Sequence, residues 1–499
     1  MPSLSSCLLL LSLLLPFVTS FTHPGLAVNN ADIARIKTKL AARKEPWQAS
    51  WDKLVSLKYS QATYVNQAVS RVHRGQYNGA ASNAKLLWHD VAAAFNLGMR
   101  WKIEGNKSYA EAASNILGAW GRTLKNLDDT DDQYLFAGLQ GSELVNAAEL
   151  IRDYPSFESS GNAKAFRAMF EEVFLSKNIF FLNHQAPSEH NVKHFHANWE
   201  LCNMASVLAF GIYTDNTTLF DYAIDYFKNG DGNGGINNAF TNLVKEPGTG
   251  TIMAQPQEAG RDQGHTALDF QLHGVIAQQA WNQGVDLYGY NNSRILQGAE
   301  YFARYNLGND VPFQPWTNNI QTFTTISNAS RGATRPTWEL LYAHYVQVKG
   351  MKAPWTTLYR NHTIYKTGYE TGIGAGGDTS GQYDGLGWGS LLHRLDEDDV
   401  QGAQSAASVA GPVASPTPAP VRSTLVAMSK TTSHVESSIS SVSYTSSKPN
   451  SSKEASTRTV AVTPVTPSQS ANATPEPHPP VTSIHRKPNA CARRSRRRI

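Results

Sequence analysis

The sequence predicts an all-α protein, an (α/α) toroid of paired inner and outer helices followed by a disordered C-terminal tail. Apolar residues recur three and four positions apart along much of the chain, which is the period of a helix with one buried face. Strand-like alternation is scarce, and breakers such as Gly, Pro and Asn separate roughly a dozen segments of helical period. An α-solenoid is the rival architecture, but the chain shows no fixed-length self-similarity.

Five segments show the helical period most clearly. They cover residues 33–40, 87–99, 135–150, 201–212 and 268–279. Two glycine-rich stretches, 229–251 and 367–389, interrupt the pattern and predict long loops, which in a compact body are more often functional than accidental. We place both near the mouth of a cleft and expect a β-rich subdomain at 362–395.

The chain is expected to contain three parts. Residues 1–20 have the short apolar run and small residues of a secretory signal peptide, which predicts a secreted, extracellular protein. Residues 21–399 have the apolar content of a globular body, whereas 400–499 are rich in Ser, Thr and Pro and cannot bury enough surface to fold. Seven Asn-x-Ser/Thr sequons are further signs of secretion: Asn106, Asn216, Asn291, Asn328, Asn361, Asn450 and Asn472.

Charge and cysteine content narrow the class of protein. Residues 400–499 hold twelve Lys or Arg and three Asp or Glu, which leaves 32 basic and 37 acidic residues in the rest of the chain. A mildly acidic body excludes a nucleic-acid binder, no segment reads as a membrane anchor, and we expect a monomer. The cysteines are Cys7, Cys202 and Cys491, so the body is held by its core, and Cys202 is expected to be buried.

Two polar segments are candidates for chemistry. In 194–204, a helix would place His194 and Asn198 on one face, although these groups could also solvate a helix start. In 255–266, Glu258, Arg261 and His265 would share a helical face with Asp262. An ordinary ion-pair network would explain the second segment too, but a charged neighbour would also set the tautomer and pKa of His265, as general-base catalysis requires.

These segments carry a resemblance to the alginate-lyase superfamily, and within it to polysaccharide lyase family thirty-eight. The similar strings lie within residues 24–395 and are 194–204, 258–266, 280–284, 286–290, 300–301, 305–308, 335–336 and 338–339. The resemblance implies an incomplete or closed (α/α) toroid that cleaves alginate or glucuronan by β-elimination. It implies Asn198 as the group that neutralises the substrate carboxylate and His265 as the catalytic histidine, with Glu258 and Arg261 beside them.

Elimination on a uronide needs a neutralised carboxylate, a base for the C5 proton and an acid for the leaving oxygen. The family uses a Tyr in the proton transfer, but 313–317 reads Phe-Gln-Pro-Trp-Thr. The rival tyrosines are Tyr288, Tyr301, Tyr305, Tyr342 and Tyr383, and by its spacing His194 could serve instead. Arg335 is a candidate for binding a substrate carboxylate, Trp316 for stacking on a sugar, and Tyr383 for lining a subsite.

Other functions remain open at this level. A glycoside hydrolase on the same fold would need two opposed carboxylates, for which Glu200, Glu258 and Asp262 are candidates. A catalytically silent carbohydrate-binding protein, presented on the tail, is a second possibility. A zinc site built from His190, His194, His196 and His265 lacks a convincing completing ligand, so we expect neither a metal nor another cofactor.

Overall fold

The computed structural model describes residues 20–75, 79–127, 130–186, 193–318, 321–332, 334–370 and 384–400. The chain divides into two units, Met1–Ser415 and Pro416–Ile499, and every described residue belongs to the first. All but the last residue of the expected signal peptide and all but the first residue of the expected tail therefore lie outside the described residues. No described helix is long and apolar enough to cross a bilayer.

The described part is built mainly of helices. Its first half contains α1 (Asn30–Ala41), α2 (Trp47–Ser56), the 3-10 helix η1 (Lys58–Ser60), α3 (Lys85–Glu104), α4 (Lys107–Thr123), α5 (Asp132–Leu150), α6 (Pro155–Ser159), α7 (Asn162–Met169), the π-helix η2 (Phe170–Leu175) and α8 (Ser176–Leu182). The five segments with the clearest helical period all fall wholly within helices. Residues 33–40, 87–99 and 135–150 lie in α1, α3 and α5, 268–279 lies in a helix of the second half, and 201–212 lies in the helix that follows next.

The second half begins with this helix. It contains α9 (Ala197–Tyr213), α10 (Thr217–Asn229), α11 (Ile236–Ala239), the strands β1 (Phe240–Lys245) and β2 (Ile252–Pro256), the 3-10 helix η3 (Gln257–Gly260), α12 (Gln263–Trp281), α13 (Tyr290–Asn306), the strands β3 (Trp316–Thr317) and β4 (Thr322–Phe323), α14 (Trp338–Tyr342), the π-helix η4 (Ala343–Val348), α15 (Pro354–Ile364) and α16 (Gly389–Leu392). Each strand pair is an antiparallel hairpin.

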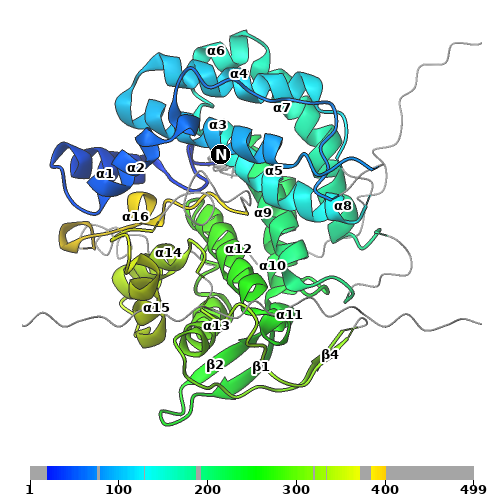
Figure 1. Cartoon of the computed structure of the whole chain (residues 1–499), viewed down its shortest axis with the longest axis vertical. Coiled ribbons are helices and arrows are strands. Elements are labelled where there is room, and N and C mark those ends of the chain that lie inside the picture. Colours follow the sequence, from blue (N-terminus) through cyan, green and yellow to red (C-terminus); the bar gives the residue numbers. More distant parts are fainter. Residues whose placement is uncertain are drawn as a thin grey trace, which may run out of the picture. The chain divides into compact units, whose positions relative to one another are not determined.

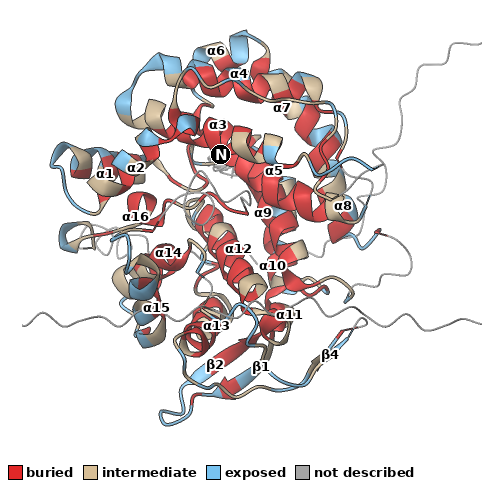
Figure 2. Cartoon of the chain, in the orientation of Figure 1, coloured by how far each residue is buried: buried red, intermediate tan, exposed pale blue. Residues whose placement is uncertain are grey.

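Inner and outer helices alternate along the chain, as a toroid requires. Helices α5, α9 and α12 are buried on nearly every side, which marks them as inner helices. Helices α4 and α10 bury one side and expose the other, so they lie outside. Figure 2 shows this difference as mainly red ribbons for α5, α9 and α12 and mixed colours for α4 and α10. The helices pack as neighbours in the order α3, α5, α9 and α12 (Figure 1).

The last helices return to the first and close the ring. Helix α16 packs against α1, α2 and α14. The guanidinium of Arg35 on α1 donates to the carbonyl oxygen of Leu392 at 2.5 Å, and the ammonium of Lys39 is 2.6 Å from Asp396. The expected toroid is thus confirmed, with ends more than 350 residues apart in sequence joined by polar contacts.

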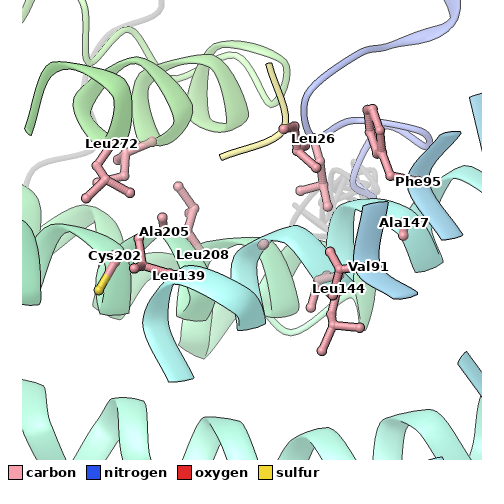
Figure 3. Packing of buried hydrophobic residues seen from close by; sticks show 14 of the residues in the cluster. Leu26, Val91, Phe95, Leu139, Leu144, Ala147, Cys202, Ala205, Leu208 and Leu272 are labelled. Carbon is pink, nitrogen blue, oxygen red and sulfur yellow. The ribbon is translucent and has the colours of Figure 1, made fainter. Parts of the chain in front are cut away.

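The inner helices share one apolar core. Figure 3 shows a part of it, with labelled side chains from the N-terminal segment and from α3, α5, α9 and α12: Leu26, Val91, Phe95, Leu139, Leu144, Ala147, Cys202, Ala205, Leu208 and Leu272. Cys202 is fully buried, as expected, and burial raises the pKa of its thiol. Burial of this apolar surface, and not disulfide bonding, stabilises the described body.

Two expectations about the glycine-rich stretches were wrong. Residues 229–251 are not one long loop, because α11 and β1 form within them. The described residues of 362–395 contain the end of α15 and all of α16 instead of a β-rich subdomain. Residues 371–383, which hold most of the second stretch, lie outside the described residues.

Close packing of α5 on α9 depends on Gly138. A Cβ at this position would lie 2.3 Å from Sγ of Cys202 and 2.7 Å from the backbone N of Asn203. We expect Gly138→Ala to lower the free energy of unfolding by about 1–3 kcal/mol through overpacking, although alanine favours a helix by roughly 1 kcal/mol. Denaturant unfolding would measure the change. Gly75→Ala is the control, since its Cβ would meet nothing within 4 Å; equal stability of the two variants would contradict the prediction.

Candidate active site

The start of α9 is bound by side chains from a distant part of the chain. Its first residue is Ala197, and the preceding His196 has extended backbone without a capping side chain. Instead, the amide N–H of Ala197 donates to Oε1 of Gln257 at 3.0 Å, and that of Asn198 donates to Oε1 of Glu258 at 3.1 Å. These acceptors satisfy amides that lack partners within the helix, and a carboxylate there is favoured by the helix dipole.

The expected helical face of His194 and Asn198 was wrong. His194 precedes α9 and is therefore not one turn away from Asn198 on the helix. The backbone carbonyl of His194 accepts a hydrogen bond from Nδ2 of Asn318 at 3.3 Å, and its ring packs edge-on against Phe195. Asn198, by contrast, lies at the centre of the polar cluster.

The segment from Glu258 to His265 is also not one helix. Glu258 lies in η3, and Asp262 has extended backbone as the N-cap of α12. The Asp262 side chain accepts from the backbone N–H of His265 at 2.8 Å, a typical capping bond. The break still brings Glu258, Arg261 and His265 together with Asp262, because the 3-10 turn and the first turn of α12 follow each other directly.

A continuous hydrogen-bond network joins these residues. Nδ2 of Asn198 donates to Oε1 of Glu258. Nη1 of Arg261 donates to Oε2 of Glu258 at 2.8 Å, and Nη2 of Arg261 is 3.1 Å from Nε2 of His265. Nδ1 of His265 is 2.6 Å from Oδ2 of Asp262. Because a carboxylate only accepts, Nδ1 of His265 carries a proton and Nε2 is left to accept from Arg261.

Burial and charge determine the ionisation of the two carboxylates. Burial acts to raise the pKa of Glu258, but the neighbouring charges of His196 and Arg261 outweigh it and hold that pKa below its usual value. Burial likewise opposes ionisation of Asp262, yet hydrogen bonds from His265 lower its pKa to about 2. Both groups are therefore charged at neutral pH, and each fixes one side of the Arg261–His265 pair.

The network runs from the interior to the surface. The Glu258 side chain is 0% exposed, that of Arg261 27% and that of His265 41%. Oδ1 of Asn198 is buried, and the described residues offer it no hydrogen-bond partner. The side chains of His265 and Arg261 are therefore accessible from solvent, whereas the amide of Asn198 faces Glu258. The accessible part of the site combines a neutral imidazole nitrogen with a guanidinium.

An aromatic wall stands beside this cluster. The Trp316 ring stacks on Phe323, with centroids 6.0 Å apart and planes at 12°, and both rings lie near His196. Gly260 permits the contact, since a Cβ there would lie 2.5 Å from Cβ of Phe323. Trp316 is half-buried and so keeps one part of its ring available. The structure thus brings Trp316 near the polar cluster, as a sugar-stacking role would require.

Arg335 lies on another side of the segment. Its Nε donates to the carbonyl oxygen of Gly264 at 3.1 Å, and its Nη1 is 3.1 Å from Oδ2 of Asp384. It precedes the N-cap of α14, Thr337, as the sequence indicated. Tyr383 lies outside the described residues. Its neighbour Asp384 borders a cavity of about 60 Å³ that is also lined by polar side chains, among them Glu143, Gln271 and Thr337.

The described tyrosines that were candidates for proton transfer make contacts with residues other than His265. The hydroxyl of Tyr288 donates to Oε1 of Gln278 at 3.1 Å, and that of Tyr301 donates to the carbonyl of Pro312 at 2.9 Å. The rings of Tyr305 and Tyr342 lie under the guanidinium groups of Arg331 and Arg360 respectively. All four have structural contacts, and the described residues assign none of them to His265.

Sequence reasoning described three residues of this site incompletely. Asp262 was placed on one face with His265 and considered as a hydrolase carboxylate, but it was not named as the group that fixes the His265 tautomer. His196 was named only as a zinc ligand, and Phe323 was not singled out. The N-cap pattern of an Asp three residues before His265 could have identified Asp262. Within the described residues no three His, Cys, Asp or Glu side chains are placed to hold a metal ion, and His190 lies outside those residues.

The first glycine-rich stretch holds the start of α9 through Glu200. Oε2 of Glu200 accepts from the backbone N–H of Gly234 at 2.7 Å, and a Cβ at Gly232 would lie 1.7 Å from Oε1. Nδ2 of Asn233 then donates to the carbonyl oxygen of Phe195 at 2.6 Å. The loop therefore fixes the backbone just before His196, which is a positioning function that its glycines make possible.

Solved structures of similar fold include alginate lyase A1-III from Sphingomonas species A1. That structure has a TM-score of 0.50 and 15% identity, and the match covers 76% of this chain and 98% of the other. A histidine-to-alanine variant of alginate lyase A1-III, complexed with tetrasaccharide, has a TM-score of 0.52 and 13% identity, with 76% and 98% covered. At such identities the likeness shows the fold. No curated protein matches the sequence.

The alginate lyase family model matches residues 34–313, more than half of the 499 residues, so this chain belongs to the alginate lyase family. It is a polysaccharide lyase. The matched region contains the whole network from Asn198 to His265. It ends before Trp316, Arg335 and Tyr383, so these three candidates rest on this chain's own residues.

The Asp262–His265 pair gives a first test. Asp262→Asn removes the charge that fixes the proton on Nδ1, so Nε2 becomes protonated in part of the molecules and cannot accept a proton. We expect kcat/KM for elimination to fall by about 10²–10⁴-fold, the usual contribution of acid–base catalysis. Asp215→Asn is the matched control, since Oδ1 of Asp215 is 3.0 Å from Nε2 of His23 in a pair that involves no residue of α12. Similar activity of the two variants would count against the assigned tautomer.

Glu200 gives a prediction about pH. Burial raises its pKa from 4.5 to about 8, against the hydrogen bond from Gly234. The folded state therefore binds the Glu200 proton more tightly than the unfolded state does. Because of this difference, the free energy of unfolding falls as pH rises from 4.5 to 8, by at most about 1.4 kcal/mol per pH unit. Glu200→Gln keeps an acceptor without ionising, so its unfolding free energy should fall less over this range. Glu172→Gln, at an exposed position, is the control; parallel pH curves for Glu200→Gln and the wild type would refute the prediction.

Proposed function

We propose that this lyase cleaves a uronic-acid polymer, alginate or glucuronan, by β-elimination, with His265 as the base. The observation that carries the proposal is the hydrogen-bond network in which Asp262 fixes the His265 proton on Nδ1 and Glu258 fixes Arg261 beside Nε2. The network thus presents a proton acceptor and a carboxylate-binding cation side by side, which elimination on a uronide requires.

Arg261 and Asn198 are proposed to neutralise the substrate carboxylate. When the polymer binds, Nη2 of Arg261 exchanges Nε2 of His265 for a carboxylate oxygen of the sugar, which frees the imidazole lone pair. Asn198 contributes the second N–H of its amide group, since the first is donated to Glu258. Neutralising the carboxylate stabilises the carbanion that forms when the C5 proton leaves.

His265 is proposed to accept the proton that leaves C5 and to be one of two candidate donors to the leaving oxygen. Nε2 of His265 takes the C5 proton, the electron pair forms the C4–C5 double bond, and the C4–O4 bond breaks. The leaving oxygen takes a proton, which His265 itself can return if the C5 proton and the leaving group lie on the same side of the ring. His194 is the second proposed donor, as the described tyrosines are engaged in their own contacts.

The remaining candidates are proposed to bind flanking sugars. Trp316, stacked on Phe323, offers an aromatic surface next to the cluster. Arg335 would offer its guanidinium to a carboxylate in exchange for Asp384. Tyr383 is proposed as a subsite residue on its sequence context alone. The assignment to polysaccharide lyase family thirty-eight, within the broader family, is likewise a proposal based on the sequence strings.

A glycoside hydrolase is less well supported. Glu200 and Glu258 are 2% and 0% exposed, and their oxygens bind the Gly234 amide and Arg261. Two carboxyl groups that flank a glycosidic bond must instead face the sugar. A silent carbohydrate-binding protein would need no ordered base, and the Asp262–His265 pair argues against it.

We further propose that the protein is secreted and acts as a monomer. Four of the described sequon asparagines are exposed, as glycan attachment requires: Asn106, Asn216, Asn328 and Asn361.

The decisive experiment measures ultraviolet absorbance of alginate, glucuronan and hyaluronan solutions during incubation with the enzyme, because elimination creates an unsaturated uronide. We expect absorbance to rise with alginate or glucuronan, and the rise to be abolished in His265→Ala. His362→Ala is the control, since His362 lies on α15 and packs against Tyr359. New reducing ends without absorbance would indicate a hydrolase, and binding without cleavage a silent protein; either result would overturn the proposal.

A further inference from the structure

A third acid, beyond Glu258 and Asp262, lies directly behind the proposed catalytic network. Asp269 is on α12, four residues after His265, and so occupies the next turn on the same side of the helix. It is 2% exposed, and neither of its carboxyl oxygens has a partner among the usual donors of the described residues. An isolated carboxylate at such a depth would be costly, so the group needs either a cation or a proton.

The group that Asp269 meets is Glu258. The two side chains are within hydrogen-bond contact, which two carboxyl groups can make only if one of them carries a proton. Glu258 already accepts from Asn198 through Oε1 and from Arg261 through Oε2, and both bonds favour its ionised form. The proton therefore belongs to Asp269, and the pair resembles two carboxyls sharing one proton.

We propose that Asp269 is a positioning residue that, in its protonated form, donates a hydrogen bond to Glu258 and thereby holds Asn198 and Arg261 in place for elimination. This inference rests on the proposed function of the site. Asp269 touches no substrate in this arrangement. It acts through Glu258, whose oxygens must point simultaneously at α9 and at Arg261.

The surroundings of Asp269 keep the proton in place. Burial and the adjacent charge of Glu258 raise its pKa well above the usual value, Asp262 adds to the effect, and only Arg261 opposes it. On the far side, Nδ1 of His273 donates to the backbone carbonyl of Asp269 at 2.7 Å. Burial lowers the pKa of His273 to about 4, so this imidazole is neutral and brings no charge that would ionise Asp269.

Aromatic side chains complete the enclosure. The His273 ring packs against Phe227, Phe240 and Phe270, and its Nε2 is buried with no partner among the described residues. From α9, Asn198 faces Glu258, and the positive charge next to the pair is the guanidinium of Arg261 on the accessible side. Glu258 thus faces the charged Arg261 on its accessible side and the neutral, protonated Asp269 on its buried side.

The test compares Asp269→Asn with Asp269→Ala. The amide of Asn keeps a hydrogen-bond donor to Glu258 and cannot ionise, so we expect activity close to that of the wild type and loss of any alkaline decline that the wild type owes to Asp269. Ala leaves Glu258 without this donor, and we expect kcat/KM to fall by up to about 100-fold with KM changing less than kcat, as a displaced catalytic group predicts. If Asp269 were needed only for folding, Asp269→Asn would not combine near wild-type activity with a changed pH profile.

A spectroscopic measurement makes the proposal independent of activity. The infrared carbonyl band of a protonated carboxyl group should be present in the wild type and weakened in Asp269→Asn, as a difference spectrum at neutral pH. Asp90→Asn is the control for stability, because Asp90 is fully buried but binds Tyr64 and Trp120.

The outcomes separate the two proposals. If no polymer gives absorbance with the wild type, the proposed function fails, while the infrared band still reports whether Asp269 is protonated. If the band is unchanged in Asp269→Asn, Asp269 is ionised and the inference is overturned. Equal activity of the Asn and Ala variants, whether both high or both low, would also overturn it, since only the donor distinguishes them at Glu258.

Discussion

The carboxylate of Glu258 is the interaction on which the site depends. One oxygen binds the first turn of α9 through the backbone and side chain of Asn198, and the other binds Arg261 just before α12. Asn198 and Glu258 are 60 residues apart in the sequence. A buried charge is costly unless fully paired, and here the pairing is supplied by the groups that we propose for elimination. The energy that stabilises this part of the toroid therefore also orients the reactive groups.

The toroid places this carboxylate where both helices begin. Inner helices such as α9 and α12 are buried on nearly all sides, so their polar N-terminal residues can reach solvent only at the ends. Their first turns offer free amide groups and a favourable dipole for negative charge. Asp262 and Glu258 use these positions as caps, and the cap of α12 is at the same time the partner of the His265 imidazole. The same hydrogen bonds thus cap the helices and fix the geometry of the proposed catalytic groups.

Much of the fold could be predicted from the sequence, because helical period is a local property. The apolar spacing at 135–150 and 268–279 predicted α5 and α12, and the types of residue in 258–265 identified the network. The sequence could not show that α9 starts at Ala197, since its cap comes from Gln257 and Glu258 across the fold. It also could not show that Trp316 stacks on Phe323, or that Asp269 lies against Glu258, because such contacts depend on tertiary packing.

Glu258 is proposed to hold Arg261 next to His265, and the rate of elimination by a Glu258→Gln variant tests this role. The amide can still accept from Asn198, but its NH₂ faces Nη1 of Arg261, donor against donor, so Arg261 is released. The account predicts a fall in the initial rate of absorbance increase by about 10²–10³-fold, with unchanged helical content. Glu339→Gln, which alters another buried Glu–Arg pair with Arg360, should leave the rate much less affected. Wild-type rates in Glu258→Gln would contradict the account.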